Sequence, residues 1–159
     1  MTLTVRRAQE KDMGSMADIL NEIIEIGGTT AYRDKFDRQR VEKEFMPARL
    51  GISCFVALNG TKVLGFQALL WSDPDWPGDD RLPEDWAVIA TYVDPTTQKG
   101  GIGRALFAET SQAAKEAGVR FIDATIRKEN TGGQRYYQGL GFSDYRSGAN
   151  SVSKKFAPA

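Results

Sequence analysis

The spacing of apolar and polar residues predicts a strand and two helices in the first third of the chain. Polar and apolar residues alternate over 4–7, as in a short strand, and apolar residues over 13–24 recur at helical spacing. Asp12 is the expected N-cap of this helix, and the Gly-Gly-Thr-Thr run at 27–30 is expected to end it. The charged segment 37–45 predicts a second, more exposed helix.

The rest of the pattern predicts a hairpin followed by alternating strands and helices. Two apolar runs flank the pair Asn59-Gly60, which is typical of a β-hairpin turn. A helix predicted at 103–117 ends at Gly118. The predicted strands are 52–58, 62–71, 86–93, 121–126, 142–147 and 151–156, and a further helix is predicted at 130–138. This order predicts an α/β (α+β) fold, with antiparallel strands first and a strand-helix-strand unit later.

Length and composition predict one domain over 1–159. With 159 residues, 41% of them hydrophobic, the chain can bury one core without disulfides or metals. Lysine plus arginine equal aspartate plus glutamate at 21 each, so no overall positive charge favours nucleic-acid binding. The N-terminus lacks the apolar core of a signal peptide, and no run of about 18 apolar residues occurs. We therefore expect a cytoplasmic protein that binds neither nucleic acid nor membrane.

The lack of histidine narrows the chemistry. It removes Ser-His-Asp and Cys-His nucleophiles, histidine general bases and histidine-containing zinc sites, and we expect no metal. The single cysteine, Cys54, lies in the apolar run 52–58 and is expected to be buried. A covalent acyl-cysteine intermediate is therefore not expected.

A glycine-rich turn between a predicted strand and a predicted helix is the main candidate for a binding site. Gly100, Gly101 and Gly103 allow backbone N–H groups of the segment 94–104 to converge, and the following helix directs its positive end at the same point. Such a turn binds phosphate oxygens. The same glycines would also suit an ordinary strand-to-helix loop.

Two other phosphate-binding motifs do not fit. The P-loop requires a glycine, four residues and then Gly-Lys-Ser/Thr, and the sequence contains no such string. The dinucleotide fingerprint requires a glycine where Leu106 stands. Asp123 lies at a suitable distance for a ribose contact, but a dinucleotide unit normally begins a doubly wound sheet and does not follow a hairpin.

The segment Gln98-Lys99-Gly100-Gly101-Ile102-Gly103 resembles the acetyl-coenzyme A motif of GCN5-related N-acetyltransferases. Asn130 and the segment 136–142, Tyr-Tyr-Gln-Gly-Leu-Gly-Phe, resemble the family's second signature, in which an asparagine precedes a tyrosine by seven residues. The resemblance implies a mixed, mostly antiparallel sheet of about six to seven strands flanked by about four helices. It also implies acetyl-CoA as cosubstrate and transfer of the acetyl group to the primary amine of a small molecule.

The same resemblance implies roles for individual residues. In this family the strand before the glycine turn separates from its neighbour, and the pantetheine arm pairs with the free edge as an added strand. By position, the backbone of Val93 would hold the arm, the N–H of Thr91 would face the thioester oxygen, and Tyr137 would lie nearest the departing sulfur. The implied catalytic residues are Tyr137 and Thr91, and the implied coenzyme-binding residues are Thr91, Val93, Gln98, Lys99, Gly100, Gly101, Ile102, Gly103, Arg104, Asn130 and Tyr137.

The sequence leaves the proton acceptor for the amine open. The segment 21–25 weakly resembles phosphinothricin acetyltransferases, which carry a glutamate in the strand before the glycine turn, but the matching residue here is Val88. Glu25, Glu84 and Asp85 are the nearest substitutes, and a water relay is an equal alternative.

The polar connection 72–85 carries six acids and lies near three tryptophans, Trp71, Trp76 and Trp86. In this fold it would border the acceptor side and attract a cationic amine through charge and cation–π contact, or it is a solvated surface loop. A non-catalytic acyl-CoA-binding sensory module and acetylation of a protein amine are the alternative functions. A homodimer is compatible with the resemblance, since related small-molecule acetyltransferases are often dimers, but the sequence gives neither the oligomeric state nor the acyl-chain preference.

Overall fold

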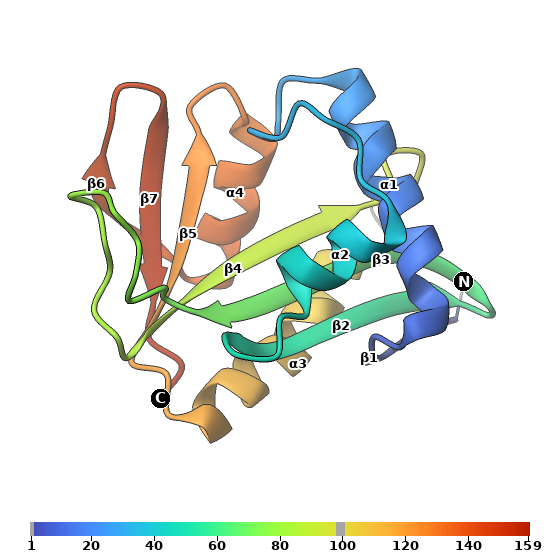
Figure 1. Ribbon diagram of the computed structural model, residues 1–159, viewed down its shortest axis with the longest axis horizontal. Helices are drawn as coiled ribbons and strands as arrows, with labels where there is room; N and C mark the ends of the chain where they lie inside the picture. The colour runs from blue at the N-terminus through green and yellow to red at the C-terminus, as the bar shows by residue number, and fades with distance from the viewer. Residues whose placement is uncertain (1, 98–100) are drawn as a thin grey trace.

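Seven strands form a single sheet within residues 2–97 and 101–159, which the computed structural model describes (Figure 1). The strands are β1 (Leu3–Arg7), β2 (Gly51–Asn59), β3 (Lys62–Trp71), β4 (Trp86–Val93), β5 (Phe121–Arg127), β6 (Ser143–Ser147) and β7 (Ser151–Phe156). Their order in the sheet is β1-β2-β3-β4-β5-β7-β6, and neighbours are antiparallel except for the parallel pair β4 and β5. The mixed, mostly antiparallel sheet implied by the sequence is therefore confirmed.

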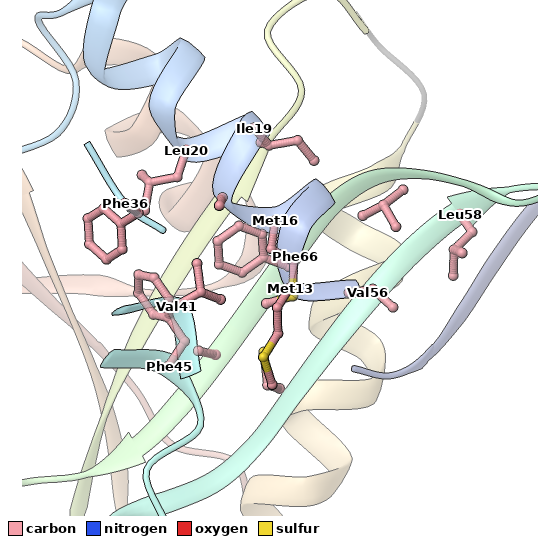
Figure 2. Close-up of a cluster of buried hydrophobic side chains, with 14 residues drawn as sticks. Met13, Met16, Ile19, Leu20, Phe36, Val41, Phe45, Val56, Leu58 and Phe66 are labelled. Carbon is pink, nitrogen blue, oxygen red and sulfur yellow. The ribbon is translucent and has the colours of Figure 1, made fainter. Parts of the chain in front are cut away.

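Helices cover both faces of this sheet (Figure 1). The short 3₁₀ helix η1 (Glu10–Asp12), α1 (Met13–Ile26) and α2 (Arg38–Phe45) lie on one face, and α3 (Ile102–Ala117) and α4 (Thr131–Leu140) lie on the other. Figure 2 shows how Met16, Val41 and Phe66 meet under α1 and α2. The apolar residues at helical spacing in α1 therefore form the buried side of that helix, as the sequence predicts.

The predicted elements occur in the expected order, with small differences at their ends. Helix α3 begins at Ile102, one residue before its predicted start. Helix α4 reaches Leu140 and ends at Gly141, whose φ of 105° suits a residue without a side chain. Phe142 was predicted to begin a strand, but its N–H donates to Tyr137 O at 3.0 Å and its ring is buried. The turn that ends α4 thus delays β6 by one residue.

Asp12 precedes α1 as predicted, but its side chain does not cap that helix. Its carboxylate accepts from both terminal nitrogens of Arg6, at 2.7 and 3.0 Å, and from Gln9 N–H at 2.8 Å. The guanidinium supplies a charged, two-pronged partner, which is stronger than a single backbone N–H. The predicted capping role is therefore wrong, and Asp12 instead fixes β1 to the start of α1.

The two parallel strands at the centre of the sheet separate after three residue pairs. Pairing between β4 and β5 joins Trp86 to Phe121, Ala87 to Ile122 and Val88 to Asp123, and β4 continues for five residues beyond Val88. Across the same length β4 stays paired with β3 on its other side. The sheet is thus open between β4 and β5, and this opening leads toward the glycine turn.

Candidate active site

The edge of β4 that faces the opening carries free backbone groups. Asp94 N–H donates toward β3 at 2.7 Å, and Trp86 O accepts from the residue after β3 at 3.0 Å. The register between these points has no bulge. Backbone groups alternate in direction along a strand, so the odd-numbered residues of β4 direct their N–H and C=O groups away from β3. Thr91 and Val93 therefore present these groups to the opening.

A hollow of about 260 Å³ lies where the opening reaches the glycine turn. Gly101 precedes α3 with a φ of 67°, which is the left-handed conformation that favours glycine. The first N–H groups of α3 have no partners within the helix, so they can bind an anion at its positive end. The residues that line the hollow are Val93, Thr97, Gly101, Ile102, Gly103, Arg104 and Tyr136.

These features fit the diphosphate of coenzyme A. The hollow offers backbone donors and an arginine side chain, and its described lining residues include no acid. Five of the predicted coenzyme-binding residues line it: Val93, Gly101, Ile102, Gly103 and Arg104. Gln98, Lys99 and Gly100, which were also predicted to bind the coenzyme, lie outside the described residues.

Two local features shape the connection between β4 and α3. The Asp94 carboxylate accepts from the N–H of Thr96 at 2.9 Å and from its hydroxyl at 2.8 Å, which shapes the start of the turn. Gly65 lies opposite Val93 on β3, and a side chain there would come within 3.2 Å of Ile102. Glycine at 65 therefore lets the start of α3 pack directly on the sheet.

The two predicted catalytic residues are in contact. The hydroxyl oxygens of Thr91 and Tyr137 lie 2.8 Å apart. Tyr137 is buried against Phe142, with a ring-centroid distance of 5.1 Å, and burial raises the pKa of its phenol far above the usual value. A phenol in this environment stays protonated, so it can donate a hydrogen bond but does not readily give up its proton.

Sequence reasoning missed two residues that join this pair to the glycine turn. Gln67 is fully buried on β3, and its Nε2 lies 2.9 Å from Thr91 Oγ1 and 3.0 Å from the Tyr136 hydroxyl. Tyr136 in turn donates to Gly103 O at 2.7 Å, and burial raises its pKa to about 12. The one signal for Gln67 is an amide between the apolar residues Phe66 and Ala68.

Asn130 is a helix cap in this structure. Its Oδ1 accepts from Gly133 N–H at 2.8 Å, and its Nδ2 donates to Thr29 O at 3.3 Å. It therefore joins the start of α4 to the loop after α1. Asn130 does not line the hollow at the glycine turn.

The candidate proton acceptors lie on the surface. The Glu25 side chain is 75% exposed and lies 4.0 Å from Lys35. Glu84 and Asp85 are exposed and precede β4. Asp85 lies six residues before Thr91 in an extended chain, which is a separation of about 20 Å. Val88, where related enzymes were expected to carry a glutamate, is 36% exposed.

A buried carboxylate, which the sequence analysis considered only as a ribose contact, lies next to Val88. Asp123 is its register partner on β5, at the last pair before the strands separate. Asp123 accepts from Tyr145 OH at 2.5 Å and from the Thr125 hydroxyl at 2.9 Å. Burial raises the pKa of this carboxyl, and the two hydrogen bonds oppose that effect.

The connection 72–85 makes several contacts of its own. Trp76 is 51% exposed, and its Nε1 donates to Asp80 at 2.7 Å. Asp75 forms an exposed ion pair with Arg49 at 3.2 Å. Two of the six acids are therefore engaged by these partners. Asp73 is half-buried and accepts from Asp75 N–H at 2.9 Å, and the other three acids are exposed.

The remaining sequence inferences concern cysteine, metal and membrane. Cys54 is buried as predicted, and burial raises the pKa of its thiol to about 12, so it is not a thiolate nucleophile at neutral pH. Among the described residues, no three acidic or cysteine side chains gather in a way that could hold a metal ion. None of the helices described in the structure has the length and apolar character needed to cross a membrane.

The parallel pair β4 and β5 thus opens toward the N-terminus of α3, an arrangement suited to a cofactor that carries phosphate groups. The chain belongs to the acetyltransferase (GNAT) family, whose model matches residues 16–142. Members of this family are acyltransferases that use acetyl-CoA as cosubstrate.

Individual relatives agree with this membership. An N-acetyltransferase of Methanocaldococcus jannaschii is 31% identical over 90 residues, which are 57% of this chain but only 38% of that protein. The Salmonella typhimurium protein yncA, solved with its cofactor acetyl-CoA, has a TM-score of 0.81 at 18% identity, covering 100% of this chain and 95% of that one. A GCN5-related N-acetyltransferase from Kribbella flavida has a TM-score of 0.77 at 23% identity, covering 96% and 95%. The two structures share the fold.

Proposed function

We propose that this chain moves the acetyl group of acetyl-CoA to the primary amine of a small molecule by direct attack, without an acyl-enzyme. The observation that supports this most is the free edge of β4, where backbone groups of Thr91 and Val93 face an opening that ends at the start of α3. Bound acetyl-CoA would supply a thioester carbonyl as electrophile and a thiolate as leaving group. The residues of the chain then have to position the arm, hold the developing negative charge and stabilise the sulfur.

Two backbone positions perform the first two tasks. Val93 pairs with the pantetheine arm as if the arm were another strand. The Thr91 N–H donates to the carbonyl oxygen as it becomes an oxyanion, which is a contribution of roughly 3 kcal/mol in other enzymes. Because both roles use the backbone, side-chain replacement at these positions tests them only indirectly.

Tyr137 stabilises the departing sulfur by donating a hydrogen bond. A free phenol has a pKa of about 10 and a thiol of about 8.5, so full proton transfer is uphill by roughly 2 kcal/mol in water. Burial raises the pKa of Tyr137 further, which makes full transfer less favourable still. Donation without transfer is therefore the role we propose.

The amine must lose a proton before it attacks. A lysine-like amine with a pKa of about 10.4 is mostly charged at pH 7, which adds roughly 4.6 kcal/mol to the barrier. We assign this proton to water in the opening, because Val88 places no carboxylate in β4 and Glu84 and Asp85 precede the strand. If Glu25→Gln instead lowers turnover by tenfold or more, the water assignment fails and Glu25 is the base.

The acids of the connection 72–85 are proposed to attract the cationic acceptor. Asp73, Asp79 and Glu84 are not held by arginine or tryptophan among the described residues, so their charge is available. Replacing all three by their amides should raise the acceptor KM several-fold, more at low salt than at high salt, with kcat unchanged. A matched triple replacement of Glu10, Glu42 and Glu116, exposed on other elements, should leave KM unchanged. An acceptor KM that is unchanged by the first triple replacement contradicts the proposed attraction of the cationic acceptor.

The function is tested by combining coenzyme binding with an acceptor panel. Calorimetry with coenzyme A should show saturable binding. Incubation with acetyl-CoA and a panel of amines, amino acids and peptides, while free thiol is followed, should show release with small amines. Binding without release for any acceptor supports a sensory module, and release with peptides alone supports acetylation of a protein amine. Absence of coenzyme binding overturns the proposal.

A further inference from the structure

The direction of the hydrogen bonds around Gln67 can be worked out from one acceptor. Gly103 O is a carbonyl oxygen, so it can only accept. The Tyr136 hydroxyl lies 2.7 Å from it and therefore donates its single proton to Gly103 O. With that proton used, the Tyr136 oxygen can only accept from its other partner.

That other partner is the side-chain amide of Gln67, 3.0 Å away. The amide must therefore present its nitrogen, not its oxygen, to Tyr136, which fixes the orientation of a group whose N and O are otherwise hard to tell apart. The same Nε2 lies 2.9 Å from Thr91 Oγ1 and donates its second proton there. Gln67 Oε1 is left buried without a hydrogen-bond partner among the described residues, which is the cost of this orientation.

The Thr91 hydroxyl can then donate its proton in only one direction. Its oxygen accepts from Gln67, and the other side-chain partner of its hydroxyl within the described residues is the Tyr137 hydroxyl at 2.8 Å. The Thr91 proton is therefore donated to the Tyr137 oxygen. This leaves the Tyr137 hydroxyl proton without an acceptor among the described residues.

We propose that Gln67 is a positioning residue that sets which group donates and which accepts in each hydrogen bond of this network. We call this direction the polarity of the network. It keeps the Tyr137 hydroxyl proton free for the departing sulfur. Gln67 does so from one buried nitrogen, which at the same time holds Tyr136 against Gly103 in the glycine turn. The network comprises Gln67, Thr91, Tyr136 and Tyr137. The proposal rests on the role of Tyr137 in the proposed function, but the hydrogen-bond polarity itself does not.

The polarity is tested in the protein without coenzyme by NMR. We expect the hydroxyl protons of Thr91 and Tyr136 to exchange slowly with water and to show contacts with the Gln67 amide protons. The Tyr137 hydroxyl proton should exchange faster than both. A Tyr137 proton as protected as that of Tyr136, or Gln67 amide protons without these contacts, overturns the proposal whatever the activity of the protein.

Two substitutions distinguish polarity from packing. Gln67→Glu keeps the size but can only accept when ionised, so Thr91 turns to it and Tyr137 must donate to Thr91. Gln67→Met removes the polar group and leaves Thr91 free to donate to Tyr137. We expect kcat to fall in the order wild type, Gln67→Met, Gln67→Glu, with the last at least about tenfold below wild type. The Tyr137 hydroxyl proton should become slowly exchanging in Gln67→Glu alone.

A purely structural role of Gln67 predicts that kcat falls only in step with the unfolding free energy of each variant, and that the Tyr137 hydroxyl proton exchanges at the same rate in both. That result contradicts the proposal. Thr91→Val should also lower kcat, and Thr91→Ser should restore it, because serine keeps the hydroxyl. If Gln67→Glu does not fold, the NMR experiment on the wild-type protein still decides the polarity. If no amine is acetylated by the wild type, the proposed function fails, while the NMR result for the network stands.

Discussion

The ring of Tyr136 occupies the space that a side chain on Gly103 would need, while its hydroxyl donates to Gly103 O at 2.7 Å. This contact joins α4 to the first turn of α3. Gly103→Ala should therefore push Tyr136 out of place, cost about 1–3 kcal/mol of unfolding free energy and weaken coenzyme A binding by about tenfold or more. Chemical denaturation and calorimetry measure the two effects.

A matched glycine replacement provides the control for this prediction. Gly14 lies in α1, and an added side chain there would meet nothing within 4 Å. Gly14→Ala should leave coenzyme A binding unchanged and leave stability equal or slightly higher, because alanine favours a helix. Equal effects of the two replacements on coenzyme A binding would show that Gly103 has no special contact.

Tyr137→Phe should lower turnover more than it lowers acetyl-CoA affinity. Loss of one hydrogen bond to the sulfur predicts a fall in kcat of about tenfold or more, with the KM for acetyl-CoA changed by about twofold or less. Because burial raises the pKa of Tyr137, the ratio of the two turnover rates should stay constant between about pH 6 and 9. Single-turnover measurements isolate the chemical step, and an unchanged rate there refutes the role. Tyr145→Phe, on β6, is the control for removing a tyrosine hydroxyl.

Asp123 should make the protein less stable as pH rises. Burial raises the pKa of its carboxyl in the folded state. Its contribution to stability is therefore fully present below the unfolded pKa of about 3.9 and is lost as pH rises through the folded pKa. Asp123→Asn stays neutral, so its stability relative to wild type should increase from about pH 4 upward. Urea denaturation over a pH series measures this, and a difference that is constant with pH contradicts it.

Asp12 should show the opposite dependence. Hydrogen bonds from Arg6 lower the pKa of its carboxyl, although burial acts against them. The stability it contributes is present above the unfolded pKa of about 3.9 and is lost as pH falls through the lower folded pKa. Asp12→Asn should cost about 1–3 kcal/mol at pH 7, and the cost should shrink below about pH 4. The same urea series measures it, and a cost that persists in acid would point to packing in place of charge.

The local pattern of the sequence was sufficient for the secondary structure and for the glycine turn. Period-2 and helical spacing depend on neighbours within a few residues, and so do the turn at Asn59-Gly60 and the cap after Ala117. The position of Gly101 and Gly103 at the start of α3 follows from the same local signals. These elements depend on local interactions and need no distant partner, so the sequence pattern alone predicts them.

Contacts between distant residues were decided by the tertiary structure. Gln67 meets Tyr136 across 69 residues, and Tyr136 meets Gly103 across 33. Asp12 was read as a cap because the pattern does not show that Arg6 reaches it from β1. The pairing of Val88 with Asp123 depends on strand register, and the opening beyond that pair depends on where the pairing stops. Residue types and spacing thus determined the helices, the strands and the glycine turn of this chain. Strand register and packing decided which side chains are in contact, because those contacts form only when the whole sheet is assembled.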